Sequence, residues 1–169
     1  MADELGTADG ADFISGGGGE LPEIGVISQY VKDLSFENPN APAIYQNDQP
    51  PEINVQFDIA ANQVGDEIHE VSLKIEVRAE SKGQVAFLVE LAFAGLFGLR
   101  NIPADALQPF LLGEAPRLLF PFARRVVADA IRDGGFPPLM LDPIDFNLLY
   151  HQQAAQQAGG QLPGQFGQA

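Results

Sequence analysis

The sequence predicts an α+β fold in which a four-stranded antiparallel sheet carries C-terminal helices packed on one side. Three observations indicate this fold: alternating apolar and polar residues recur between residues 26 and 77, short turns separate the expected strands, and helical spacing begins only after Pro103. Strands followed by helices are typical of an antiparallel sheet with helices gathered on one face. A length of 169 residues suits one such domain.

Three of the expected strands have one polar face. Val26–Phe36 alternates imperfectly and is followed by a Pro-rich loop at 37–42, where the prolines prevent both helix formation and sheet pairing. Residues 53–59 and 71–77 alternate cleanly, which predicts strands with one buried and one wet face. The turn at Lys82–Gly83 then predicts an antiparallel hairpin with the next strand.

The fourth expected strand, residues 85–97, is apolar on both faces. Glu90 is its single charged residue, although an antiparallel strand normally exposes one polar face. Two explanations stay open: a surface for self-association, since most soluble oligomers are homo-oligomers, or a second layer of the same chain. Self-association is the leading interpretation.

Two helices are expected directly after the strands. Residues 104–112 suit a short helix, and a longer one is expected from Ala115 to Gly134–Gly135, which ends it. The apolar positions at helical spacing in the longer helix predict the stripe that faces the core. They are Leu118, Leu119, Phe122, Val126, Ala130 and Ile131.

The two ends of the chain differ from its middle. Residues 1–25 hold six acids, no Lys or Arg and a glycine run, a composition that predicts a disordered acidic arm. Residues 152–169 are mostly Gln, Ala and Gly without charge, which predicts a flexible tail. The folded domain is therefore expected at 26–151, with a last helix that Asp142 caps and His151 ends.

The charge balance limits the classes of partner that the protein is expected to bind. Nine Lys and Arg against 23 Asp and Glu give −14 at pH 7, which repels nucleic-acid phosphates and anionic membrane surfaces. The absence of cysteine removes a disulfide framework, thiol catalysis and Cys-ligated zinc. With no signal peptide and no apolar run of membrane length, the cytoplasm is the expected compartment.

Catalytic signatures are weak, so neither an enzymatic activity nor a cofactor is expected. His69 shares the parity of apolar strand neighbours, which indicates a partly buried position on the core side. His151 is interpreted as a structural residue at a helix end. A metal site built from Asp66, Glu67, His69 and Glu70 is not expected, because these residues alternate faces around a turn.

Two features go beyond a plain globular fold. Acidic residues on the strands suit either a solvated face or a docking surface for a basic partner. They are Asp33, Glu37, Glu76 and Glu90, with Leu88 beside them. Apolar residues in irregular segments suit either caps of the core or a groove for extended apolar chains. They are Phe36, Ile44, Tyr45, Phe97, Phe136, Leu139, Met140 and Leu141.

Four sequence blocks resemble the SecB family of bacterial export chaperones. They are Tyr30–Pro42, Phe87–Glu90, Leu119–Arg124 and Gly135–Phe146. The resemblance spans residues 26–151 and implies an α+β protomer that assembles into a homotetramer, a dimer of dimers. Such proteins hold unfolded precursor proteins in the cytosol and deliver them to the SecA motor for export. They use no nucleotide and do not insert into the membrane.

The resemblance also implies roles for residues at matching positions. Those that match the family's motor-docking surface are Asp33, Glu37, Leu88 and Glu90. Those that match positions used in subunit assembly are Val89 and Leu91. Those expected in the client-binding grooves are Phe36, Tyr45, Phe97, Phe136 and Met140.

Two functions from other classes remain as alternatives. A small-ligand or lipid carrier would enclose the apolar residues in a pocket of its own. A hydrolase that uses paired carboxylates would need two acids converging in a cleft, and none of the strand acids is placed to show this.

Overall fold

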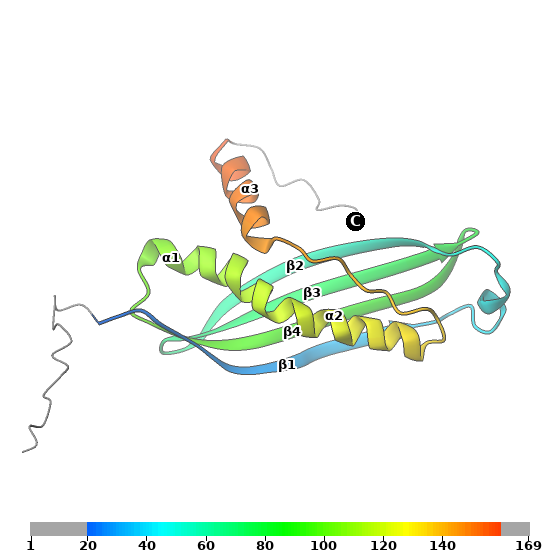
Figure 1. The fold of residues 1–169 in the computed structure, drawn as a ribbon, viewed down its shortest axis with the longest axis horizontal. Helices are drawn as coiled ribbons and strands as arrows, with labels where there is room; N and C mark the ends of the chain where they lie inside the picture. Colours follow the sequence, from blue (N-terminus) through cyan, green and yellow to red (C-terminus); the bar gives the residue numbers. More distant parts are fainter. Residues whose placement is uncertain (1–19, 160–169) are drawn as a thin grey trace, which may run out of the picture.

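The computed structural model describes residues 20–159, which form one sheet and its helices. Four antiparallel strands make up the sheet: β1 (Glu23–Glu37), β2 (Glu52–Gly65), β3 (Ile68–Ser81) and β4 (Gln84–Arg100). They are ordered β1-β4-β3-β2, so β1 and β2 are the edge strands (Figure 1). The expected fold class is confirmed, and each strand is longer than the alternating segment that predicted it.

The helices follow the sheet in the chain and lie on one side of it (Figure 1). α1 (Ala104–Pro109) runs through a π-helical turn, η2 (Phe110–Glu114), directly into α2 (Ala115–Asp133), and α3 (Phe146–Ala158) comes last. The expected break between two helices after residue 112 is therefore wrong. Among residues 20–159, no helix is long and apolar enough to cross a membrane.

The core lies between α2 and one face of the sheet, which we call the helix face. Odd-numbered residues of β3, from Val71 to Val77, are almost completely buried there, together with odd-numbered residues of β4. From α2, residues such as Leu119 and Ile131 pack onto them. The opposite face, called the free face below, carries no helix of the described chain (Figure 1). No second layer of the described chain therefore accounts for the apolar residues of β4 on that side.

Two irregularities change which residues of β1 point to which face. Ile27 and Lys32 each form a bulge opposite β4, so the alternation of side chains shifts by one residue at each point. As a result Val31 and Phe36 share the helix face, whereas Tyr30 and Asp33 both lie on the free face. These shifts explain why the alternation of this segment is imperfect.

The loop between β1 and β2 is tied to the end of α2. Its short 3₁₀ helix, η1 (Ala43–Gln46), buries Ile44. The Tyr45 hydroxyl donates to the Gly134 carbonyl at 2.7 Å, and Asn38 Nδ2 donates to the same oxygen at 3.2 Å. Because a Cβ at Gly134 would overlap the Phe36 ring, glycine lets β1 and the helix end approach closely.

The buried stripe of α2 is turned away from the expected one. Leu119 and Ile131 are fully buried as expected, but Phe122 is 48% exposed, and Leu118 and Val126 are only partly buried. The core-facing residues are instead Ala115, Pro116, Leu119, Phe120, Ala123, Val127, Ala128 and Ile131. The apolar pattern of this segment thus combined a buried stripe with a second, outward stripe, in which Phe122 is exposed while Leu118 and Val126 still contact the core.

The last helix begins and ends later than predicted. Asp145, not Asp142, is its N-cap, and the Asp145 carboxylate accepts from the Leu148 backbone N–H at 2.9 Å. α3 continues to Ala158, so His151 lies inside the helix and the first residues of the expected tail are helical. Gln and Ala favour helix, which explains the extension. Residues 1–19 of the expected arm and 160–169 of the expected tail lie outside the described residues, and Glu23–Gly25 already belong to β1.

Candidate functional site

Aromatic rings from four segments meet where the β1–β2 loop contacts the end of α2. Phe36 of β1 stacks on Phe87 of β4 with 6.2 Å between ring centroids. Phe136, from the link after α2, lies 4.8 Å from Phe87 and 5.4 Å from Tyr45. Tyr45 is 48% and Met140 61% exposed. We call the neighbouring aromatic residues Phe36, Tyr45 and Phe136, together with the exposed Met140 four residues further along the same link, the loop cluster; these are four of the five residues expected in a client groove.

Phe97, the fifth, does not join this cluster. Its side chain has no exposed surface and packs edge-on against Phe110, with 5.6 Å between centroids. It pairs with Val26 and His69 near the far end of β4, whereas Phe87 is near the start of that strand. Phe97 is therefore a core residue, and it is not available to a bound chain.

An apolar hollow, separate from the loop cluster, lies between edge strand β2 and α3. Its volume is about 170 Å³. The residues that line it are Phe57, Asp58, Ile59, Leu112, Phe146, Leu149, Tyr150 and Gln153. The link from Phe136 to Asp145 joins the loop cluster to this hollow along the chain. Sequence reasoning did not find it, because the apolar residues of α3 gave no sign of which strand they would face.

The acidic residues expected to form a docking surface all lie on the free face. Glu37 is opposite Leu88 across β1 and β4, and Glu76 is opposite Glu90 across β3 and β4. Asp33, Glu76 and Glu90 line one shallow hollow of about 100 Å³, together with Lys74, Leu91 and Ala92. Carboxylates from three neighbouring strands therefore converge, with Leu88 beside them.

These carboxylates make no ion pair with the described part of the chain. The cations bind other acids: Lys82 binds Asp48, Arg117 binds Glu114 and Arg132 binds Asp129. Within residues 20–159 no salt bridge reaches the docking carboxylates, which are Asp33, Glu37, Glu76 and Glu90. Their negative charge is therefore available to a partner.

A polar network crosses the free face beside this hollow. The Tyr30 hydroxyl donates to Glu70 Oε2 at 2.5 Å, and Lys32 Nζ donates to Glu70 Oε1 at 2.6 Å. Both bonds run from β1 over β4 to β3, and Ala94 beneath them is fully buried. The hydrogen bond from Lys32, followed by that from Tyr30, lowers the pKa of Glu70. The same hydrogen bond from Tyr30 to Glu70 raises the pKa of Tyr30 to about 12.

The two residues expected in subunit assembly are inside the protomer. Val89 and Leu91 are 1% and 2% exposed, on the helix face beneath α2. Apolar surface is instead exposed on β1 and on the outer side of α2. On β1, Ile24, Val26, Val31 and Leu34 are each 45–51% exposed on the helix face. Together with Phe122, they were not recognised from the sequence as surface residues.

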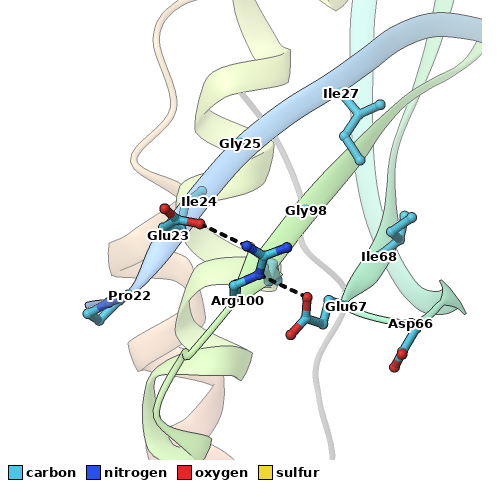
Figure 2. A pocket seen from close by; sticks show the side chains of 11 residues that line it. Pro22, Glu23, Ile24, Gly25, Ile27, Asp66, Glu67, Ile68, Gly98 and Arg100 are labelled. Carbon is cyan, nitrogen blue, oxygen red and sulfur yellow. Dashed lines mark hydrogen bonds and ion pairs between the residues drawn. The ribbon is translucent and has the colours of Figure 1, made fainter. Parts of the chain in front are cut away.

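A wider hollow of about 700 Å³ lies at the end of the sheet where β1 begins. Figure 2 shows Arg100 between two carboxylates, with Ile27 and Ile68 on the side walls. Arg100 is 3.5 Å from Glu23 and 3.1 Å from Glu67, so these polar groups pair with one another. The hollow is open, and of the charged residues that line it only Asp66 has no salt bridge within the described residues.

No cluster suited to metal binding is present in residues 20–159. No three His, Asp or Glu side chains there lie close enough together to hold a metal ion. His69 is half-buried on the helix face, the expected core side, and its Nδ1 atom has no hydrogen-bond partner in the described chain. The arrangement offers binding surfaces: apolar at the loop cluster and acidic on the free face.

Comparison with known proteins identifies the family of this chain. The family model described as preprotein translocase subunit SecB matches residues 18–157. The chain belongs to the SecB family. Among curated proteins, the protein-export protein SecB of Rhizorhabdus wittichii is 59% identical over 157 residues, 93% of each chain. That of Sphingopyxis alaskensis is 62% identical over 141 residues, 83% of this chain and 82% of that one. This chain is thus a protein-export chaperone of the SecB family.

The fold of this chain is similar to that of a solved structure. A SecB-like chaperone of Mycobacterium tuberculosis, in complex with a peptide from the HigA1 antitoxin, superposes with a TM-score of 0.60. The match covers 72% of this chain and 90% of that one, at 18% sequence identity. At this identity the likeness concerns the fold.

We predict that Glu70→Gln lowers the free energy of unfolding by about 1 kcal/mol at pH 7, because Lys32 loses its charged partner but is half exposed and screened by water. Since the pKa of Glu70 is lowered in the folded state, its contribution is present above the usual carboxyl pKa of 4.5 and is lost as the pH falls below it. Urea unfolding at equal protein concentration should show the difference between variant and parent shrinking towards pH 3. A constant difference at every pH would contradict the charged pair.

Proposed function

We propose that this SecB-family chaperone works in the cytoplasm as a homotetramer that holds unfolded precursor proteins and passes them to the SecA motor. It acts by binding alone and catalyses no reaction. The observation that supports this best is that the loop cluster and the acidic free face occupy separate parts of one protomer. A client and a motor can therefore be bound at the same time.

The loop cluster suits a client without a fixed sequence. Tyr45 and Met140 expose large apolar side chains, and a thioether adapts its shape to different neighbours. Each contact of this kind is weak. A long unfolded chain that reaches several clusters of one oligomer gains affinity through effective concentration. This mode of binding also lets single segments detach one by one during transfer.

The free face suits a basic partner. Its four docking carboxylates lack internal ion pairs, and the overall charge of −14 adds long-range attraction. Leu88 offers an apolar contact beside Glu37, Glu76 and Glu90. We assign the docking of SecA to Asp33, Glu37, Leu88 and Glu90.

The exposed apolar residues on the helix face of β1 and on the outer side of α2 suit a contact between subunits. β1 is an edge strand with unpaired backbone groups, and its helix-face residues next to α2 are apolar and half exposed. The outward stripe of α2, centred on Phe122, extends this surface. Val89 and Leu91 would support assembly indirectly, because they pack beneath α2 and hold this helix in place.

The alternative of a small-ligand carrier finds less support. The apolar hollow beside α3 measures about 170 Å³, whereas pockets for small molecules usually measure about 300 Å³ or more. The larger hollow at the end of the sheet is open and bordered by paired charges.

We predict that Met140→Ser weakens binding of an unfolded client about twofold to fivefold, because it removes an exposed apolar contact. The probe is reduced, carboxymethylated lactalbumin, and fluorescence anisotropy measures its binding. Val64→Ser serves as the control, because Val64 is similarly exposed but lies at the β2–β3 turn, the other end of the sheet. Equal weakening by both substitutions would argue against the loop cluster as the client site.

We predict that the double variant Asp33→Lys, Glu90→Lys loses SecA binding by at least tenfold, because two cations replace two docking carboxylates. Client binding should remain at the parental level. The control is Asp105→Lys, Asp133→Lys, which changes the net charge equally but alters the helix side. Calorimetry with purified SecA measures docking. If the control loses as much affinity, net charge rather than this surface governs the interaction.

We predict that Phe122→Glu reduces the mass of the assembly, because a carboxylate replaces an exposed ring in the proposed subunit contact. Light scattering at about 10 µM protomer measures the mass. Arg125→Gln changes the charge by the same amount on the exposed side of α2, and it should leave the mass unchanged. An unchanged tetramer in the Phe122 variant would place the subunit contact elsewhere.

A further inference from the structure

Three cations share the free face with the docking carboxylates. Lys32 precedes Asp33 in the chain, Arg78 lies opposite Leu88, and Lys74 lines the same hollow as Asp33 and Glu90. An unpaired cation at such a place is a competitor for any basic partner, because it can neutralise a docking carboxylate from within the protein. Whether each of these cations already pairs with another carboxylate therefore affects how much negative charge the surface presents to a partner.

Lys32 is bonded to a carboxylate outside the docking set. The bulge at Lys32 brings its side chain to the free face, where Nζ lies 2.6 Å from Glu70 Oε1. Glu70 is only 13% exposed and accepts a second hydrogen bond from Tyr30. A carboxylate that is held in place from two sides is a better fixed partner for an ammonium group than a fully exposed one.

The other two cations provide a comparison. Arg78 is bonded to Glu80, with 2.6 Å between Nη2 and Oε1, but both side chains are about half exposed, so this pair is less firmly held. Lys74 makes no salt bridge within residues 20–159. Lys32 and Lys74 thus have the same chemistry beside the same hollow, one with a partner and one without.

We propose that Glu70 is a positioning residue for partner docking: by binding Lys32 it keeps this ammonium group away from Asp33 and leaves the Asp33 carboxylate free for a basic partner. Glu70 itself lies outside the docking hollow and acts only through Lys32. The inference rests on the docking of SecA proposed above and adds a residue that determines its strength.

The test is a double-mutant cycle on Lys32 and Glu70, read as SecA affinity by calorimetry at about 150 mM salt, where charges more than roughly 8 Å apart are screened. Glu70→Gln should weaken docking about threefold to fivefold, the range that one surface ion pair supplies. Lys32→Met alone should change it less than twofold. Adding Lys32→Met to Glu70→Gln should restore the parental affinity.

Three further variants make the outcome interpretable. Lys74→Met removes a cation that has no partner, so it should strengthen docking about as much as Lys32→Met does in the Glu70→Gln background. Glu52→Gln removes an exposed charge from the same sheet without releasing a cation, and it should have little effect. Client binding by every variant verifies that the fold and assembly are intact.

The result that overturns the inference is additivity: if Lys32→Met strengthens docking equally with Glu70 and with Gln at position 70, Glu70 contributes only its own charge. Failure of the proposed docking looks different. In that case Asp33→Asn leaves SecA affinity unchanged, and no member of the cycle alters it.

Discussion

The packing of α2 against only one face of the sheet is the constraint on which the rest of the structure depends. Odd-numbered residues of β3 and β4 are buried against Leu119, Ala123 and Ile131, which fixes the position of the helix. Phe36 continues this core onto β1, where glycine at position 134 admits its ring. Once these contacts form, the even-numbered residues of β3 from Glu70 to Arg78 lie on the free face, where packing constrains their chemistry little, except for that of the buried Ser72.

This one-sided core separates two kinds of surface. Apolar residues of the loop cluster lie where the core reaches its edge, so Phe36 and Phe136 contact both buried and exposed neighbours. The free face is far enough from the core to hold carboxylates from three strands without burial cost. The proposed binding of an unfolded chain and the proposed docking of a basic partner place different demands on the sequence, and the fold offers a different side for each.

Strand alternation predicted much of this arrangement. The parity of residues 71–77 identified the buried face of β3. The face of Tyr30 relative to Asp33 was not predictable, because a bulge leaves no clear mark in the hydrophobic pattern. The stripe of α2 was misjudged because Phe122 has the periodicity of a core residue but faces outward. Phe97 was misplaced because an aromatic residue on a strand is equally suited to a core and to a groove.

The central claim is that client and motor use separate surfaces of one protomer, and hydrogen–deuterium exchange of the assembled protein tests it most directly. With an unfolded client bound, protection should increase in the β1–β2 loop and in residues 135–141. With SecA bound, it should increase in β3 and β4 around Glu76 and Glu90, and the two patterns should add when both partners are present. Protection of the same residues by both partners, or loss of one pattern when the other forms, would contradict the account.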